Sequence, residues 1–298
     1  MALTINTNLS SIVAQSNLAK ATTSLNQAIE RMTTGYKINH AGDNAAGYSI
    51  ARNWETQLGS LDVAADNAAT GADMLSTLED TYSLVSTHLQ RVRDLTEQAS
   101  NGTYGSASLK AIKSEITARL EEVDRIAANC EFNGLKMMDG SMGEISLQVG
   151  LYSSNDSRIK LDAQLFAEGD IGSLFKGYSG DNTLVDKAKV AEACTGIKSD
   201  NTRDASIKPA DMLSKIDKVI NEISNRVTTL GAAQNRIDSA IESIGVQSEN
   251  ITSSLSTLRD ADIAEESSNY IQSQILQQAA ATLLATANQT PSIALNLL

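Results

Sequence analysis

The residues that could carry out acid–base, nucleophilic or metal chemistry are few and scattered. The chain has two histidines, His40 and His88, and two cysteines, Cys130 and Cys194, and no motif joins them. The metalloprotease motif HExxH, the nucleophile motif GxSxG, the Walker phosphate loop and GxGxxG are all missing from the sequence. We therefore expect no catalytic residues and no cofactor, and we predict that the protein is not an enzyme.

The densest acidic cluster consists of Asp260, Asp262, Glu265 and Glu266. Such a cluster could bind a cation, but the spacing of a calcium-binding EF-hand, with its glycine, is missing. Carboxylates at the start of a helix are also favoured by the helix dipole, and we interpret the cluster as a solvated helix start. The sequence therefore predicts no metal site.

The two cysteines show neither the CxxC spacing nor a Cys/His pattern that binds metal. Free cysteine is among the most buried residue types, so we interpret Cys130 and Cys194 as small apolar residues. A disulfide between them is an alternative that nothing in the sequence supports.

The composition indicates helices that pack closely. Of the 298 residues 41% are hydrophobic but 4% aromatic, so the core must consist mostly of Ala, Leu, Ile and Val. The formal net charge of −12 argues against a nucleic-acid partner. No segment reaches the roughly 18 uncharged apolar residues of a membrane span, and the first residues lack the pattern of a Sec signal peptide. We predict no membrane insertion.

The first helical pattern is a heptad seam in which alanine alternates with a larger residue. The seam ends at Gly35, and the glycine-containing segment 34–51 is typical of a loop or hinge. Its members are Ala14, Leu18, Ala21, Leu25, Ala28 and Met32.

A second, longer seam predicts a helix from about Ala45 to Ala99, roughly 80 Å in length. This is far longer than an ordinary globular helix, which favours a coiled coil or rod. Asn101-Gly102 ends the pattern, and a third helix with apolar residues from Leu109 to Ile126 on one face is short enough to fold back.

Strand periodicity replaces helical periodicity after about Phe132. Ile145, Leu147 and Val149 alternate with polar residues, and Ile159 and Leu161 do so after a turn-rich segment, which predicts a β-hairpin. Residues 168–183 are typical of a loop, and the segment up to Lys208 carries weak signals.

Pro209 suits the first turn of a helix, and it begins another long seam that continues to Leu258. The charged segment LRDADIAEESS then predicts a break. We expect the last helix to run from about Asn269 to Ala287 and Pro291 to stop it.

The order of these patterns is symmetric about the hairpin, which predicts a mainly α fold: a long antiparallel helical coiled-coil rod with a small β-hairpin region and paired N- and C-terminal helices. One pair of short helices is marginal alone, so its apolar faces predict contacts with other copies. The candidate polymerisation residues are Leu18, Leu25, Met32, Ile271, Ile275 and Leu283.

Many segments, in order, resemble the bacterial flagellin family. In the N-terminal part they include INTNLSSIVAQSNLAKA, MTTGYKINHAGDNAAGYSIA and LQRVRDLTEQASNG. In the C-terminal part they include LGAAQNRIDSAI, LRDADIAEES and QILQQAAATLLATANQTP. The resemblance covers about residues 1–165 and 210–298.

The resemblance implies a structural subunit that polymerises into the flagellar filament for motility. It implies an inner coiled-coil domain of residues 1–44 plus 256–298, and a rod domain of residues 45–255 with a short variable insert at about 165–208. It also implies export of the unfolded chain by the flagellar type III apparatus to a place outside the cell. The implied partners are copies of the chain, an export chaperone, and the filament cap and hook-junction proteins.

The segment QRVRDLTEQ resembles the flagellin surface that host Toll-like receptor 5 binds. The resemblance implies a receptor site made by Gln90, Arg91, Leu95, Gln98 and Glu115. The alternative is that these residues pack between subunits, and the two roles are compatible.

The apolar C-terminal tail is recognised in the family by inflammasome sensors and, further in, by the chaperone. This implies a role for Leu295, Leu297 and Leu298, although the chain lacks the family's terminal basic residue.

Two other functions compete with the filament subunit. A flagellin-like hook–filament junction protein would resemble the family at both ends, but the match through the second and third helices disfavours it. A protease carried by the filament is disfavoured by the missing HExxH and the short middle segment.

Overall fold

The computed structural model describes the chain except residues 1–6, 177–185, 199–201, 203, 205–206 and 296–298, and the side chains of 290–295. The chain divides into two compact units. Unit 1 comprises residues 1–59 and 247–298, and unit 2 comprises residues 60–246. The bounds of the inner and rod domains stay a prediction.

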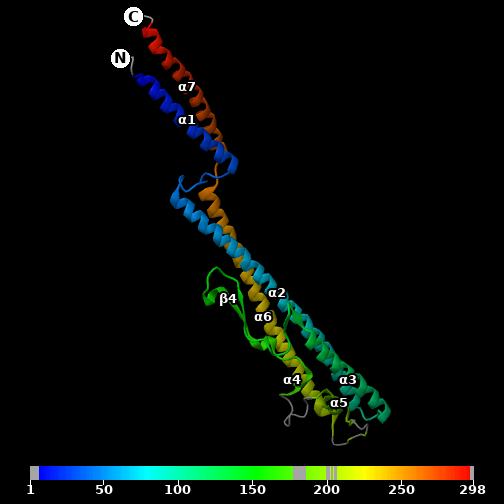
Figure 1. Ribbon diagram of the computed structural model, residues 1–298. Coiled ribbons are helices and arrows are strands. Elements are labelled where there is room, and N and C mark those ends of the chain that lie inside the picture. The colour runs from blue at the N-terminus through cyan, green and yellow to red at the C-terminus, as the bar shows by residue number, and fades with distance from the viewer. Residues whose placement is uncertain (1–6, 177–185, 199–201, 203, 205–206, 296–298) are drawn as a thin grey trace. The chain divides into compact units, whose positions relative to one another are not determined.

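Unit 1 is built around a pair of antiparallel helices, α1 (Leu9–Thr34) and α7 (Ile263–Leu295) (Figure 1). Helix α1 ends at Gly35, whose φ of 75° is left-handed, and the Gly35 amide donates to the carbonyl of Arg31 at 2.8 Å. A glycine adopts this conformation without the steric cost of a Cβ. The pairing of the terminal helices and the stop at Gly35 confirm the prediction.

Two long helices, α2 (Ala45–Ser100) and α6 (Pro209–Arg259), contribute to both units. In unit 2 they are antiparallel: Gln234 Nε2 donates to Glu79 Oε2 at 2.8 Å, and Arg93 Nε donates to Asp217 Oδ1 at 2.5 Å. The 56-residue α2 and the start of α6 at Pro209 confirm two sequence-based predictions.

Helix α3 (Ser106–Asn129) completes the helical core of unit 2, and its buried face is the one that the sequence predicts. The core is continuous and apolar. Its largest fully buried side chains include Tyr82, Phe166, Phe175, Leu89, Ile116 and Leu120.

Two small antiparallel hairpins follow α3. In the predicted hairpin, β3 (Ile145–Gln148) pairs with β4 (Arg158–Leu161), and Leu147 lies opposite Ile159. The other hairpin pairs β1 (Glu131–Phe132) with β2 (Leu135–Lys136). Its two-residue turn is Asn133-Gly134, both at positive φ, a strong hairpin signal that our sequence reading missed.

The segment that we expected to be a loop contains helix α4 (Ile171–Lys176), so that prediction was wrong. Helix α5 (Lys187–Thr195) and the 3-10 turns η1 (Asn155–Ser157) and η2 (Ala163–Phe166) lie in the same part of the chain. Both helices pack on α3. They are too short for a clear period, but they bury Phe175, Val190 and Cys194 completely.

Helix α7 is longer than the sequence predicts at both ends. The break is limited to Asp260–Asp262, because the Asp262 side chain accepts from the amides of Ala264 and Glu265 and begins a helix there. At the other end the helix continues through Pro291. A proline has no N–H to donate to the carbonyl four residues back, which is that of Ala287. Asn8 Nδ2 supplies that hydrogen bond at 2.7 Å.

Candidate functional surfaces

The seam between α1 and α7 is made of residues at seven-residue intervals, all of them small except Glu266. On α1 the buried residues are Ala14, Ala21 and Ala28. On the described part of α7 they are Glu266, Ser273 and Ala280. Small side chains let two helix backbones approach closely, so this pair gains contact area without large apolar groups at its centre.

The larger aliphatic residues of this pair lie outside its centre. Leu18, Leu25 and Met32 are half-buried. Ile271, Ile275 and Leu283 are 55%, 60% and 63% exposed. All six are the candidate polymerisation residues of the sequence analysis. The three on α7 are exposed enough to contact another molecule, whereas the three on α1 are partly covered.

A groove follows the seam on one side of the pair, with a volume of about 610 Å³. We refer to it as the α1–α7 groove. Its lining combines small and polar residues with two leucines of α7, Leu276 and Leu283. The composition of this groove is typical of a binding surface for protein side chains. It is not typical of a catalytic site, because the groove holds no pair of titratable groups suited to acid–base catalysis.

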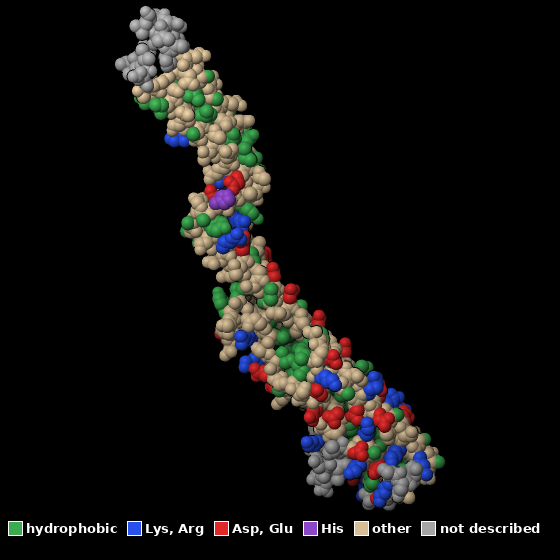
Figure 2. All heavy atoms as spheres, viewed as in Figure 1, with side chains coloured by type: hydrophobic (Ala, Val, Ile, Leu, Met, Phe, Trp, Pro, Cys, Tyr) green, Lys and Arg blue, Asp and Glu red, His purple; other side chains and the backbone are tan. Residues whose placement is uncertain are grey.

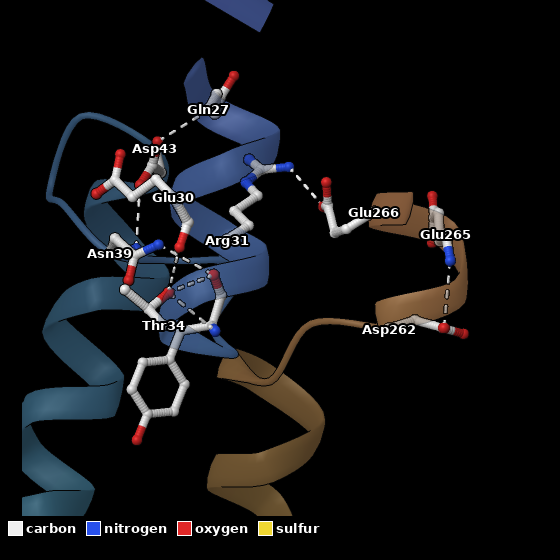
Figure 3. A network of polar contacts seen from close by, with 10 residues as sticks. Gln27, Glu30, Arg31, Thr34, Asn39, Asp43, Asp262, Glu265 and Glu266 are labelled. Atoms are coloured by element: carbon white, nitrogen blue, oxygen red, sulfur yellow. Dashed lines mark hydrogen bonds and ion pairs between the residues drawn. The ribbon is translucent and has the colours of Figure 1, made fainter. Parts of the chain in front are cut away.

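An ion pair links α1 to the first turn of α7 (Figure 3). Arg31 Nη1 lies 3.1 Å from Glu266 Oε1, and the Glu266 side chain is 8% exposed. The Arg31 Nε atom is buried and has no hydrogen-bond partner within the protein. A charge at a buried seam position is costly unless it is paired, and Arg31 supplies that partner for Glu266.

The acidic cluster is therefore a helix start, as predicted, but it is not fully solvated because Glu266 is buried. Asp262 caps α7, and Glu265 and Glu266 lie in its first turn, near the positive end of the helix dipole. Among the described residues no group of three or more His, Cys, Asp or Glu side chains could hold a metal ion.

A turn at residues 37–43 connects α1 to α2 and is organised by Asp43 (Figure 3). The Asp43 carboxylate accepts from the amides of His40 at 3.0 Å and Asn39 at 3.1 Å, and from Gln27 Nε2 at 3.2 Å. The hydrogen bond from the His40 amide is the main cause that lowers the pKa of Asp43. His40 Nε2 also lies 2.7 Å from Glu30 Oε1.

The chain segments at the ends of α1 and α6 are joined by backbone and side-chain contacts. The Lys37 amide donates to the carbonyl of Arg259 at 2.7 Å, and the Ala261 amide donates to that of Gly35 at 2.9 Å. The Arg259 guanidinium lies 3.8 Å from the centre of the Tyr36 ring and pairs with Glu55. These contacts hold the α1–α2 connection against the α6–α7 connection.

Four of the five candidate receptor residues lie on the surface of α2 and α3. Arg91 pairs with Glu115 across the two helices at 3.0 Å. Gln98 Nε2 donates to the Tyr104 hydroxyl at 2.9 Å, and Gln90 Nε2 donates to Ser86 Oγ at 3.4 Å.

Leu95, the fifth candidate, is 1% exposed and packs in the core of unit 2. Its place in the apolar seam of the second helix already indicates this position. Leu95 therefore supports the surface from beneath.

The candidate residues of the C-terminal tail lie at the edge of the described chain. Leu295 is the last residue of α7, and its side chain is outside the described residues. Leu297 and Leu298 are also outside the described residues.

The two cysteines are free and buried, which confirms their interpretation as small apolar residues. Burial raises the pKa of the Cys194 thiol to about 12, and burial also raises that of Cys130. Thiols of this kind are poor nucleophiles at neutral pH.

Sequence reasoning did not foresee the contacts of Asn8 and Arg31. A pairing of Asn8 with the helix end at Pro291 has no signal in either segment alone. Glu266 gives a weak signal, because it occupies the same heptad position as Ser273 and Ala280 and a charge there requires a partner.

Comparison with known proteins identifies the family. The model of the bacterial flagellin N-terminal helical region matches residues 5–142, and that of the C-terminal helical region matches residues 213–298. Together they cover most of the chain. Within the described part, no helix combines the length and apolar character that a membrane crossing requires.

The chain is similar to flagellins over its whole length. It is 36% identical to a flagellin of Xenorhabdus nematophila, with 100% of both chains covered. It is 31% identical to a flagellin of Bacillus subtilis (strain 168), with 99% of both chains covered.

The fold is also that of a hook-associated protein. A putative flagellar hook-associated protein of Vibrio parahaemolyticus matches with a TM-score of 0.59 and 12% identity, over 73% of this chain and 100% of that one. The fold therefore does not distinguish a filament subunit from a junction protein, whereas the full-length flagellin relatives favour the filament subunit. The chain belongs to the bacterial flagellin family and is a structural, non-enzymatic subunit of the flagellar filament, which lies outside the cell.

Proposed function

We propose that copies of this chain polymerise through the α1–α7 pair of unit 1. The main support for the proposal is that the helix pair buries small side chains and exposes large aliphatic ones. Alanine, serine and the paired Glu266 occupy its centre, while Ile271, Ile275 and Leu283 are more than half exposed. Burying an aliphatic side chain of this size contributes about 1.5–3 kcal/mol, so assembly would recover energy that the isolated chain does not use.

The test is assembly of the purified chain at raised concentration, imaged by negative-stain electron microscopy. We expect filaments from the full chain and none from a chain that lacks residues 1–35. Circular dichroism of the shortened chain should still show folded helices, because unit 2 has its own core. Filaments from the shortened chain would contradict the role given to α1. A ring of few copies instead of a filament would favour the junction protein.

The chain would leave the cell unfolded through the flagellar export apparatus, with a chaperone holding its C-terminal part. The two free cysteines support this route, since no covalent link between them has to be broken before the chain is threaded. A pair of cysteines engineered within unit 2 and oxidised to a disulfide inside the cell by added diamide should retain the chain there, and a reductant should restore export. Export of the oxidised chain would contradict threading.

A second role, as a ligand of host Toll-like receptor 5, is favoured by the exposed pair of Arg91 and Glu115. Arginine anchors protein interfaces more often than other charged residues do, and the Arg91 side chain is 48% exposed. Gln90 and Gln98 lie on the same helix, and the buried Leu95 would hold that surface in place.

The receptor proposal is tested by titrating the receptor ectodomain with Arg91→Ala. We expect binding to weaken by at least about 1–2 kcal/mol. The matched control is Arg125→Ala, which removes an exposed arginine from α3 outside the proposed site. Equal affinity of Arg91→Ala and the parent chain would remove Arg91 from the site. Loss of filaments instead of receptor binding would assign the residue to subunit packing.

A further inference from the structure

Helix α7 carries a pair of exposed isoleucines on the side away from α1. Ile271 and Ile275 are one helical turn apart and 55% and 60% exposed. Each lies two residues from Ser273, which is buried in the seam, and two residues correspond to about 200° around a helix. We refer to these two residues as the isoleucine ridge. The helix pair therefore leaves more than half of each ridge side chain uncovered.

The α1–α7 groove offers a complementary surface on the same helix pair. Its lining includes Ala21, Ser24 and Ala28 from α1 and Ser273 and Ala280 from α7. Small residues leave space that a branched side chain can fill. Leu276 and Leu283, which also line the groove and are 52% and 63% exposed, add apolar surface for such a side chain to cover.

The distribution of charge selects a second copy of this chain as the occupant. The chain has a formal net charge of −12, so two copies repel each other over most of their surface. From Ser267 to its end, however, the sequence contains no Asp, Glu, Lys, Arg or His. Figure 2 shows charged side chains gathered over unit 2, while the α1–α7 pair is mostly apolar and uncharged polar on the face drawn.

The groove is also nearly free of unbalanced charge. Its charged lining residues are Lys20, Arg31 and Glu266, and the last two neutralise each other. An uncharged helix face can therefore enter without leaving Arg31 or Glu266 unpaired, while the long side chain of Lys20 can keep its ammonium group in water.

We propose that the isoleucine ridge of one copy enters the α1–α7 groove of the next copy. This inference rests on the proposed assembly through unit 1 and names the two surfaces that meet. The ridge and the groove are separate sets of residues, and the contact that polymerisation requires is heterologous: a bound copy then still presents one free ridge and one free groove. Contacts of this type produce open helical filaments when the rotation between copies does not close a ring.

Disulfide formation between two singly substituted chains tests the contact. Chains with Ile275→Cys and chains with Ser24→Cys, one of them carrying a mass tag, are mixed, assembled into filaments and oxidised. We expect a disulfide-linked heterodimer on a non-reducing gel. The native thiols do not interfere, because Cys130 and Cys194 are buried.

The matched control replaces Ser24→Cys with Asn26→Cys, on an exposed residue of α1 that does not line the groove. The control should give no more than about one tenth of the heterodimer. If a cysteine chain does not assemble alone, both chains are added as a minority to the parent chain, and the product is measured in those filaments.

Filaments without the heterodimer, or with equal yields from the two pairs, would overturn the ridge-and-groove contact and leave the filament function intact. Absence of filaments from the parent chain would instead contradict the proposed function itself. A second measurement uses the double variant Ile271→Gln and Ile275→Gln, which keeps the groove. Added at a tenth of the parent concentration, it should shorten the filaments several-fold by stopping growth at one end. Unchanged filament length would contradict the proposal.

Discussion

Unit 2 and the α1–α7 pair bury different kinds of side chain. In unit 2 the fully buried side chains include Tyr82, Phe166 and Phe175, together with many leucines and isoleucines. In the α1–α7 pair the buried positions hold alanine, serine and one paired glutamate, while large aliphatic side chains are exposed. Since apolar burial dominates folding, we expect unit 2 to be stable by itself and the helix pair to gain most of its stability from other copies.

The largest expected effect comes from the same substitution made in the two regions. Ile216→Ala in α6 removes a side chain that is 0% exposed, and it should lower the free energy of unfolding by about 2–5 kcal/mol. Ile275→Ala in α7 removes one that is 60% exposed, and it should change that free energy by less than about 0.5 kcal/mol in the monomer. Urea unfolding followed by circular dichroism measures both changes in the free energy of unfolding. Equal losses of stability would contradict the claim that the two regions bury different kinds of side chain.

Glu266→Ala should have the next largest effect, confined to the helix pair. It leaves the Arg31 guanidinium without its partner at a mostly buried position, which should cost about 1–3 kcal/mol in the pairing of α1 with α7. Hydrogen exchange of the α1 amides in assembled filaments measures this loss. Glu265→Ala, in the same helical turn, is the control, and a similar effect from both would show that the ion pair is not responsible.

Asn8→Ala should destabilise the pair by about 1–2 kcal/mol, because the Asn8 side chain caps α1 through the Ser11 amide and also donates to the Ala287 carbonyl. Asn8→Asp separates the two roles, since aspartate keeps the cap but cannot donate. We expect Asn8→Asp to fall between the parent chain and Asn8→Ala in the thermal stability of filaments. Equal stability of Asn8→Asp and the parent would show that the bond to the carbonyl opposite Pro291 is unimportant.

The smallest effect concerns the turn at residues 37–43. The folded-state pKa of Asp43 is lowered, so its carboxylate stabilises the turn above the unfolded value of about 3.9, and this contribution is lost as pH falls through the folded pKa. The amides of Asn39 and His40 should therefore exchange faster, relative to free peptide, below about pH 4. Asp43→Asn should remove this pH dependence, and its persistence would assign the titration to another group.

The sequence predicts those parts of the fold that depend on local pattern. The heptad of α1, its stop at Gly35 and the alternation in β3 and β4 follow from side-chain period and turn residues. The continuation of α7 through Pro291 could not be predicted, because it depends on a hydrogen bond from Asn8, 279 residues away. Short helices such as α4 also give too few residues to show a period.

The candidate surfaces were predictable to a similar degree. The exposed isoleucines of α7 follow from a seam that includes more apolar residues than one partner helix can cover. The pairing of Arg91 with Glu115 was not predicted, since it depends on how α3 packs on α2. The burial of Leu95 follows from its position in the apolar seam of the second helix. That position predicts its exposure better than its place in the segment QRVRDLTEQ does.

The central claim is that α1 and α7 are stabilised mainly by other copies, whereas unit 2 is stable in the monomer. Hydrogen exchange of one preparation, measured as monomer and as filament, is the most direct test. We predict that α1 and α7 amides exchange rapidly in the monomer and become protected in the filament, by a factor of at least about 100. The core amides of α3 and of α6 in unit 2 should be protected in both states. Equal protection of α1 and α7 in the monomer and the filament would contradict it.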